Sequence, residues 1–298
     1  MLDDTVCIVA GAGRGIGRAV AVELGSHGAT VVVNDLGTSL TGEGADEEPA
    51  RETIRAVRDA GGEGMAHFGD VTAPGYTEAL VEDTVAEYGR VDAVANFAGM
   101  LRDDLVYKMD VDDWDAVIEL HLRGHFTLLR SAAAHWREMA REQDDHLETQ
   151  RSFLGTTSRA ALGNVGQANY AAAKAGVMGL TRTAARELGR YNIRVNALMP
   201  TAFTRMVEQV PEEHRGFDES EMPPEKVAPM VAYLVSEAAE GITGCSIRAA
   251  GDAIGVVSDP EITHLGYREG GWTLDSIAER FREEVADGVD LDRSGERF

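Results

Sequence analysis

A tyrosine and a lysine four residues apart, Tyr170 and Lys174, form the pair of side chains with the clearest chemical potential in this sequence. On a helix, residues at this spacing share a face, so the phenol and the ammonium become neighbours. A free phenol has a pKa of about 10 and is a poor base at neutral pH, but a nearby cation favours the phenolate. Ser158 lies upstream, at the end of a predicted strand, where its hydroxyl can hold a substrate oxygen. The three residues together predict proton transfer to or from a bound hydroxyl group.

A glycine-rich turn, residues 11–17 (GAGRGIG), follows the first apolar run and precedes a helical stretch. Glycine permits a tight turn and lets the backbone approach a pyrophosphate at the N-terminus of a helix, where free N–H groups favour anions. Its position between a strand and a helix makes this a strong signal for a dinucleotide. The predicted cofactor-binding residues of the turn are Gly11, Arg14, Gly15, Ile16 and Gly17.

Asp35 ends the second predicted strand, 18 positions after Gly17. An acidic side chain there can accept hydrogen bonds from the adenosine ribose hydroxyls and would repel a 2′-phosphate, which predicts NAD rather than NADP. Arg14 argues mildly for NADP, since it could pair with that phosphate. We favour the simpler interpretation of Arg14 as an exposed arginine at the start of a helix.

The elements that must position these residues alternate along most of the chain. The apolar runs, several of them rich in β-branched residues, are typical of strands buried on both faces, and strand–helix–strand repeats predict a parallel sheet with helices on both sides. The predicted fold is therefore α/β, a Rossmann-type doubly wound parallel sheet. Strands are predicted at 5–10, 29–35, 64–68, 91–96, 152–156, 193–198 and near 246–250, and helices at 16–27, 50–60, 76–88, 111–139 and 170–190.

We predict one dinucleotide-binding domain over residues 1–255, followed by a C-terminal extension over 256–298. The extension is expected to hold one amphipathic helix near 274–286, because Ile277, Phe281 and Val285 recur at a helical spacing. A glycine- and acid-rich insertion, residues 36–49, follows the second strand and predicts a surface loop.

The composition excludes several classes of partner. The 298 residues carry 51 acidic and 28 basic side chains, a formal charge of −23, which disfavours binding to nucleic acid or to an anionic membrane. Lys108, Lys174 and Lys226 are the only lysines. No apolar run reaches the ~18 residues of a membrane span, and the start of the sequence lacks the features of a signal peptide. Two cysteines are too few for a disulfide framework, so we expect a soluble, cytoplasmic protein.

Two interpretations of the acidity stand open at the level of sequence. Abundant Asp and Glu with scarce Lys are compatible with adaptation to high salt, where screening reduces self-repulsion. They are equally compatible with an acidic, arginine-preferring proteome in an ordinary cytoplasm.

Several motifs resemble those of the short-chain dehydrogenase/reductase superfamily over about residues 3–255. They are the glycine turn, Asp70-Val71, Asn96–Gly99 (NFAG), the Ser/Tyr/Lys set and Asn196–Pro200 (NALMP). Within the superfamily the chain looks closest to the (3R)-hydroxyacyl-CoA dehydrogenase domain of peroxisomal multifunctional enzyme type 2. The phrases similar to that branch are VVVNDLG (31–37), AGMLRD (98–103), HLRGHF (121–126), GNVGQANYAAAK (163–174) and TRM (204–206).

The resemblance implies roles for further residues. Asp70 and Val71 would flank the adenine, Asn96, Ala98 and Gly99 would line the cofactor, and the loop from Pro200 to Thr204 would cover the nicotinamide side. Lys174 would bind the nicotinamide ribose, and Tyr170 would lie beside the cofactor as the catalytic base.

The sequence departs from the superfamily pattern at three places. His121 replaces the usual Asn of the long helix, which supports a water in the proton path, so we place it in the catalytic set with its relay role open. The usual spacing puts the serine 13 positions before the tyrosine; Thr157 occupies that position and Ser158 is one closer, and we favour Ser158. Phe97 replaces the second Asn of the usual Asn-Asn-Ala-Gly. His121 and His125 have the spacing of a metal pair, but without a third ligand we predict no metal.

The sequence thus predicts an NAD-dependent oxidoreductase that transfers hydride between NAD and a secondary alcohol or ketone. The resemblance implies a (3R)-3-hydroxyacyl-CoA as the substrate and a homodimer or homotetramer as the assembly. The alternatives are a 3-oxoacyl carrier-protein reductase or another short-chain alcohol dehydrogenase, and, from a different class, a non-catalytic NAD-binding regulator.

Overall fold

A computed structural model describes residues 2–208, 216–292 and 294 of the chain. The chain divides into two compact units, residues 1–257 and 258–298, and each is described by itself. The division falls two residues after the boundary expected from the sequence.

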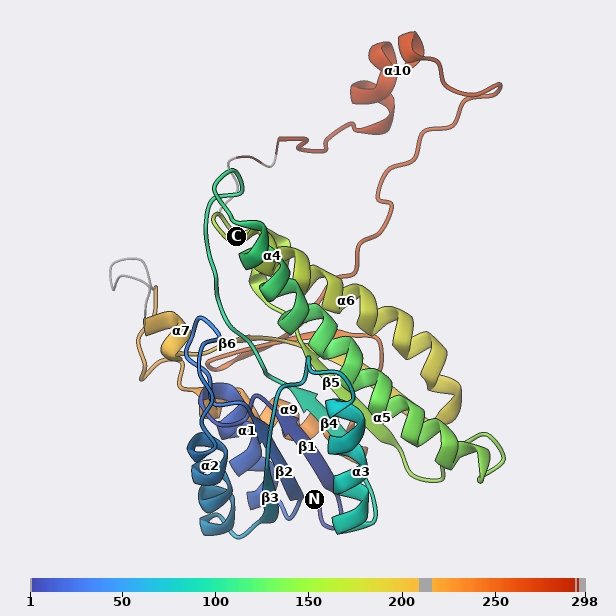
Figure 1. The fold of residues 1–298 in the computed structure, drawn as a ribbon. Coiled ribbons are helices and arrows are strands. Elements are labelled where there is room, and N and C mark those ends of the chain that lie inside the picture. The colour runs from blue at the N-terminus through green and yellow to red at the C-terminus, as the bar shows by residue number, and fades with distance from the viewer. Residues whose placement is uncertain (1, 209–215, 293, 295–298) are drawn as a thin grey trace. The chain divides into compact units, whose positions relative to one another are not determined.

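The first unit is built on one eight-stranded sheet with the order β3-β2-β1-β4-β5-β6-β7-β8 (Figure 1). Seven strands are parallel, and only β7 and β8 pair antiparallel. This arrangement confirms the predicted doubly wound α/β fold. The strands are β1 (Val6–Ala10), β2 (Thr30–Asp35), β3 (Glu63–Phe68), β4 (Ala93–Asn96), β5 (Arg151–Thr156), β6 (Ile193–Thr201), β7 (Ser246–Ala250) and β8 (Ala253–Val257).

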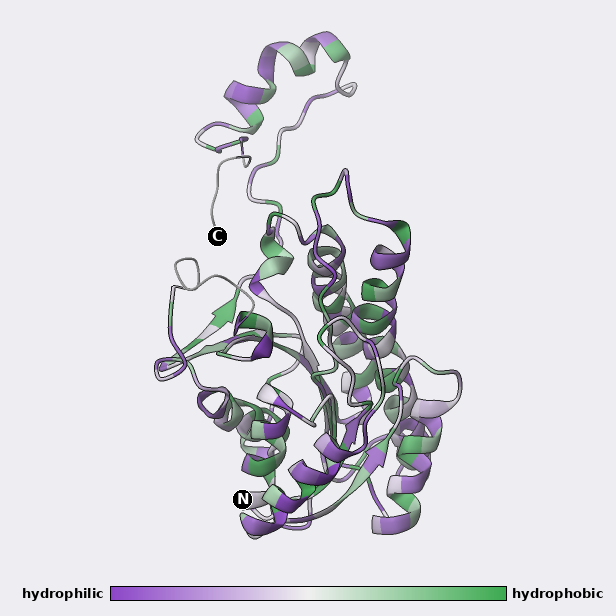
Figure 2. Ribbon diagram, turned by 60° about the vertical axis from the view of Figure 1, so that its left-hand side comes forward, coloured by the Kyte–Doolittle hydropathy of each residue, from purple (hydrophilic) through white to green (hydrophobic). Residues whose placement is uncertain are grey.

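Helices cover both faces of the sheet, because successive residues of each buried strand point to opposite sides. In β1, Cys7 and Val9 pack into one apolar cluster, while Ile8 and Ala10 pack into the other. The first cluster is closed by α1 (Gly15–Ser26), α2 (Glu48–Asp59) and α9 (Ala228–Val235), and the second by α3 (Tyr76–Tyr88), α5 (Gly124–Arg141) and α6 (Ala168–Leu188). Figure 2 shows the hydrophobic strands between helices that alternate hydrophilic and hydrophobic residues.

Several elements differ from the prediction, among them α9 and the short helix α7 (Arg205–Glu208), where no helix was predicted. The strand β8 was missed, because Ile254 and Val256 are exposed on the edge of the sheet and the strand spans the predicted domain boundary after residue 255. The predicted long helix over 111–139 is interrupted: α4 (Val111–Ile118) passes through a π-helical turn, Glu119–Arg123, into α5. Such a turn accommodates one extra residue and is frequent at functional sites.

The insertion over residues 36–49 lies at the surface, as predicted, but it is tied to other segments. The Leu40 carbonyl accepts from the Leu101 amide at 3.1 Å, and the Thr41 carbonyl accepts from the Arg102 guanidinium at 3.1 Å. The segment that follows β4 is therefore held by the segment that follows β2.

The second unit contains α10 (Leu274–Arg280) and a π-helical turn, Phe281–Val285, within the range predicted for an amphipathic helix. Its start is fixed by a capping box, in which Thr273 and Ser276 bond reciprocally to each other's backbone.

Surface arginines pair with carboxylates, several of them one helical turn away, as in Arg123–Glu119 and Arg141–Glu138. Among the described residues, no helix combines the length and apolar character needed to cross a membrane.

Candidate active site

The residues predicted to act together lie at one edge of the sheet. The carboxyl ends of parallel strands meet there, and in open α/β sheets ligands bind outside those ends. The glycine turn follows β1, Asp35 ends β2, Asn96 ends β4, and Ser158 lies two residues after β5. The sequence separates these groups by up to 147 positions, and the fold brings them to the same edge.

Ser158, Tyr170 and Lys174 meet beyond the end of β5. Tyr170 and Lys174 share a face of α6, with the Lys174 Nζ atom 5.5 Å from the centre of the tyrosine ring. The Ser158 hydroxyl shares a hydrogen bond with the phenol of Tyr170 and also accepts one from the Ala160 amide at 3.2 Å. A substrate oxygen that reaches the phenol would therefore lie beside the serine hydroxyl as well.

The two hydroxyls between which the sequence could not decide are placed differently. Thr157 is buried, and its hydroxyl donates to the Lys174 carbonyl at 2.8 Å. Ser158 is partly exposed and faces Tyr170. Only the Ser158 hydroxyl lies in contact with the phenol, while that of Thr157 fastens β5 to α6.

Burial changes the acidity of both partners. It raises the pKa of the Tyr170 phenol, a shift that the hydrogen bond from Ser158 opposes and the nearby Asp103 carboxylate reinforces. It lowers the pKa of Lys174 to about 7. Removal of both groups from water therefore penalises both charged forms, the phenolate and the ammonium.

His121 lies at the centre of the π-helical turn and is fully buried. Its ring meets that of Tyr170 edge to face, with the centres 4.9 Å apart. Its Nε2 atom lies 2.8 Å from the Met100 carbonyl oxygen and 3.1 Å from the Met100 amide nitrogen. Burial and the charge of Lys174 hold the pKa of His121 well below its usual value, so the ring is neutral. It braces the tyrosine without carrying a charge.

The glycine turn has the form that a dinucleotide cradle requires. A side chain on Gly11 would overlap the backbone of Ala98, and one on Gly17 would overlap the Gly11 carbonyl. Gly15 has a φ of +55°, a conformation that other residues rarely adopt, and begins α1. Without side chains at these positions, the backbone N–H groups of the turn are accessible at the N-terminus of a helix, where phosphate groups bind.

The carboxylate of Asp35 is hydrogen-bonded to this turn. It accepts from the Gly13 amide at 2.7 Å and from the Gly37 amide at 2.6 Å. Backbone donors fix the rotamer of the carboxylate, which leaves its remaining lone pairs for the hydroxyls of a ribose.

The other predicted cofactor residues lie around the same turn. Thr204 is beside the glycine turn, since a side chain on Gly15 would be 3.4 Å from its methyl group. Pro200 lies in β6, where it pairs with Ala249. Asn96, with its amide nitrogen buried and without a hydrogen-bond partner, bonds through its side-chain oxygen to the Ala98 amide at 3.0 Å. Gly99 packs on His121, because a side chain there would be 2.6 Å from the ring.

The remaining predicted residues follow β3 or lie in the turn and helix start after β1. Asp70, after β3, accepts from the amide and the hydroxyl of Thr72, both at 2.8 Å. Val71 is buried, and its carbonyl accepts from Thr127 of α5 at 3.0 Å. Ile16 packs against the apolar cluster beneath α1. Arg14 is exposed, as expected, with a 3.4 Å bond to the Thr38 carbonyl.

Sequence reasoning missed three residues near this site. Arg205 donates to the same Thr38 carbonyl at 3.1 Å. The Asp103 carboxylate accepts from the Gln167 side-chain amide at 2.7 Å. His125 is fully buried close to Lys174, and its spacing from His121 in the sequence suggested only a metal pair. In the part of the chain that the structure describes, no group of three His, Cys, Asp or Glu side chains is placed to hold a metal.

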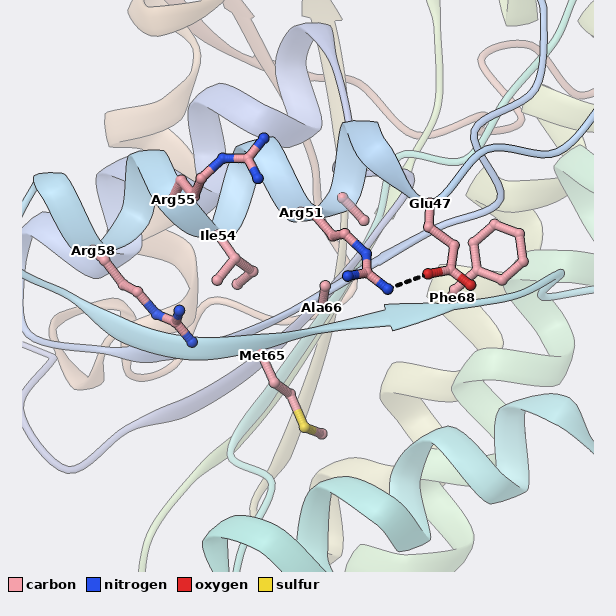
Figure 3. Close-up of a pocket in the computed structure, with 9 residues that line it drawn as sticks. Glu47, Arg51, Ile54, Arg55, Arg58, Met65, Ala66 and Phe68 are labelled. Carbon is pink, nitrogen blue, oxygen red and sulfur yellow. Dashed lines mark hydrogen bonds and ion pairs between the residues drawn. The ribbon is translucent and has the colours of Figure 1, made fainter.

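A separate surface groove lies between α2 and the outer strand β3, lined by residues such as Arg51, Arg58, Met65 and Phe68 (Figure 3). It contains none of the predicted site residues. Arg51 pairs there with Glu47, and Arg58 donates to the Gly64 carbonyl at 2.9 Å.

Comparison with known proteins agrees with this geometry. Residues 11–251 match the protein family described as enoyl-(acyl carrier protein) reductase. A short-chain dehydrogenase from Mycobacterium avium, known from its crystal structure, superposes with a TM-score of 0.83 at 35% identity over 95% of each chain. The chain belongs to the short-chain dehydrogenase/reductase family.

Several proteins of this family are similar to the chain over most of its sequence. The hydroxyacyl-CoA dehydrogenase ChsB1 of Mycobacterium tuberculosis is 38% identical, over 98% of this chain and 92% of its own length. Mouse peroxisomal multifunctional enzyme type 2 is 38% identical over 80% of this chain, which spans only 30% of that longer protein. The 3-oxoacyl-acyl-carrier-protein reductase of Thermotoga maritima is 34% identical over 82% of this chain and 95% of its own length. This short-chain dehydrogenase/reductase is thus an oxidoreductase of a family that uses NAD or NADP.

Proposed function

We propose that this protein is an NAD-dependent dehydrogenase of (3R)-3-hydroxyacyl-CoA. The observation that supports this chemistry is the cluster of Ser158, Tyr170 and Lys174 beyond the carboxyl end of β5. Asp35 lies at the carboxyl end of β2, at the same edge of the sheet. The choice of substrate is supported by the similarity to a hydroxyacyl-CoA dehydrogenase over nearly the whole chain.

In the proposed reaction Ser158 holds the substrate oxygen and Tyr170 takes the proton of the substrate hydroxyl. The Lys174 ammonium, close to the phenol, stabilises the phenolate that acts as the base. His121 keeps the ring of Tyr170 in place through its edge-to-face contact. In reduction the same phenol returns the proton to the substrate oxygen.

The cofactor would lie on the glycine turn, with Asp35 at the adenosine ribose and Lys174 at the nicotinamide ribose. When bound, the nicotinamide accepts or returns the hydride, and its positive charge in the oxidised form favours the phenolate of Tyr170. The carboxylate of Asp35 supports NAD, because it would repel a 2′-phosphate.

The helices α4 and α5 support a homodimer or homotetramer. Val111 and Trp114 of α4 and Phe126 of α5 are exposed apolar side chains, with Phe126 49% exposed. Light scattering on the full chain measures the mass of the assembly, and a monomeric mass at micromolar concentration would contradict this part of the proposal.

The test is a panel of (3R)- and (3S)-hydroxyacyl-CoA, simple secondary alcohols and 3-oxoacyl carrier protein, assayed with NAD(H) and NADP(H). We expect the highest kcat/KM for a (3R)-hydroxyacyl-CoA with NAD. A higher value for the carrier-protein substrate with NADPH would favour a reductase, for which the Thermotoga relative is the precedent. Binding of NAD without turnover of any substrate would favour a regulator.

The variant Tyr170→Phe removes the titrating group and keeps the ring. We expect kcat to fall by at least about a thousandfold with NAD binding retained. The matched control is Tyr233→Phe, since Tyr233 lies on α9 and leaves the site untouched. Near-normal turnover by Tyr170→Phe would refute the assignment.

A further inference from the structure

A buried imidazole, His125 on α5, fills a position that the proposed chemistry has not used. It has no exposed surface, and its Nε2 atom accepts a hydrogen bond from the Thr156 amide at 3.0 Å. The carbonyl of the same residue, Thr156, accepts from the Lys174 ammonium at 2.7 Å. One residue of β5 therefore links the histidine to the lysine.

The topology of the sheet explains why Thr156 depends on side chains for these bonds. The N–H and C=O groups of one strand residue point to the same edge of the strand, and those of its neighbour point to the other. The Thr157 amide donates to Leu198 of β6, so the backbone groups of Thr156 face the side of β4. The strand β4 ends at Asn96, with Ala95 and Leu154 as its last pair with β5. His125 and Lys174 therefore bond to the Thr156 backbone groups that a longer β4 would otherwise have paired with.

We propose that His125 is a positioning residue for Lys174: its neutral ring fixes the Thr156 peptide so that the Thr156 carbonyl faces the lysine ammonium. This inference rests on the function proposed above, in which Lys174 is the cation beside Tyr170. The Thr156 hydroxyl adds a second anchor by donating to the Asn96 carbonyl at 2.7 Å.

The role requires an uncharged ring with a lone pair on Nε2, which a neutral histidine provides when its proton is on Nδ1. Burial, reinforced by the charge of Lys174, holds the pKa of His125 well below its usual value, so the ring keeps this form at neutral pH. The titratable groups around the lysine are Tyr170 on the same helix, His121 on the π-helical turn and His125, and the Asp103 carboxylate acts on Tyr170.

Loss of the histidine has a predictable effect on pH dependence. If Thr156 is released, the Lys174 ammonium loses an acceptor, and its pKa falls below the value of about 7 that burial gives it. The phenolate of Tyr170 is then less stabilised, so the acid limb of the pH profile moves to higher pH.

The experiment measures the titration of Lys174 by NMR. The chain has three lysines, so ¹³C labelling at lysine Cε gives three signals, and Lys174→Arg assigns the relevant one. The variants are His125→Leu, which removes the acceptor, and His125→Gln, which returns an oxygen near Nε2. The matched control is His135→Leu, a partly buried histidine of α5 whose Nε2 atom has no hydrogen-bond partner. If His125→Leu does not fold, His125→Asn takes its place.

We expect the Lys174 midpoint to fall in His125→Leu, to stay close to wild type in His125→Gln and to be unchanged in His135→Leu. Where turnover is measured, kcat falls about tenfold in His125→Leu, which corresponds to one misplaced polar contact, while KM for NAD changes less. An unchanged midpoint and pH profile in His125→Leu, or equal shifts in His135→Leu, would overturn the proposal.

The titration needs no substrate, so the two proposals fail separately. A shifted midpoint in a protein that oxidises no hydroxyacyl-CoA would support the positioning role and refute the proposed function. An active enzyme with an unshifted midpoint would do the reverse.

Discussion

Two adjacent hydroxyls differ in what they already bind. Thr157 donates to a backbone carbonyl inside the protein, whereas Ser158 faces the phenol at the opening of the site. The spacing rule of the family favours Thr157, and the contacts favour Ser158 as the group that holds the substrate.

We expect Ser158→Ala to lower kcat by about a hundredfold or more, because a donor to the reacting oxygen is lost. Thr157→Val keeps the shape of the side chain and removes its hydroxyl, which should destabilise the fold by about 1 kcal/mol and spare most of the turnover. Steady-state kinetics and thermal unfolding of both variants separate these effects. Loss of turnover in Thr157→Val alone would assign the catalytic hydroxyl to Thr157.

The charge of the Asp103 carboxylate opposes the ionisation of Tyr170. A base works only above its pKa, so removal of this carboxylate should lower the pKa of the phenol and move the acid limb of kcat/KM to lower pH. Asp103→Asn keeps an oxygen for the bond from Gln167. The pH profile of oxidation measures the effect.

Asp104→Asn is the control, since it removes a neighbouring charge that is not a cause of the tyrosine's shift. Equal movement of the limb in both variants would indicate a general effect of charge at the surface instead of a local one.

Residues with a recognisable type and spacing could be found in the sequence, and those that act through the backbone could not. Tyr170, Lys174 and the glycine turn stand out because their chemistry depends on local spacing. His125 and Arg205 do not, because each bonds to a carbonyl or amide more than 30 positions away in the sequence. The bond that fixes each of them exists only after the sheet has formed.

At the scale of elements, the turn after β1 tolerates no side chain. Gly11→Ala would force a methyl group into the Ala98 backbone at a residue with a φ of +68°, so we expect loss of NAD binding and a destabilisation of several kcal/mol. Calorimetry of unfolding and of NAD binding measures both.

Gly179→Ala is the matched control within α6. Apart from the neighbouring backbone of α6 itself, no atom lies within 4 Å of the added methyl group, and alanine in a helix is favoured over glycine by about 0.5–1 kcal/mol. This variant should be at least as stable as wild type, and a large loss of stability would show that α6 packs differently from the description above.

Most of the parallel strands could be predicted from their apolar runs, because burial on both faces leaves a continuous signal; the outer strand β3, with a mostly exposed or half-buried pattern, carries a weaker one. The edge strand β8 could not, since its large apolar side chains are exposed and its register depends on β7. The π-helical turn also left no pattern, because α4 and α5 keep a helical period on either side of it. Its extra residue shows only in the hydrogen bonds of the folded helix.

At the scale of the whole molecule, a charge of −23 opposes the approach of the anionic cofactor and of an anionic thioester substrate. Salt screens this repulsion. We therefore expect KM for NAD and for hydroxyacyl-CoA to fall, and the melting temperature to rise, as NaCl increases from millimolar toward molar concentrations.

Kinetics and thermal unfolding across a salt series provide the measurement, with an uncharged osmolyte series as the control for excluded volume. Activity that is greatest in dilute buffer and declines steadily with salt would exclude adaptation to high salt.

The shortage of lysine has one more consequence. All but three of the 28 basic side chains are arginines, and arginine does not lose its proton under conditions in which proteins remain folded. Between about pH 7 and 10, where carboxylates are fully ionised, the charges of the arginines and carboxylates stay constant, so most of the electric field around the molecule does not change. A pH dependence of activity measured in that interval therefore reports on the few groups that still exchange protons, among them the buried Lys174.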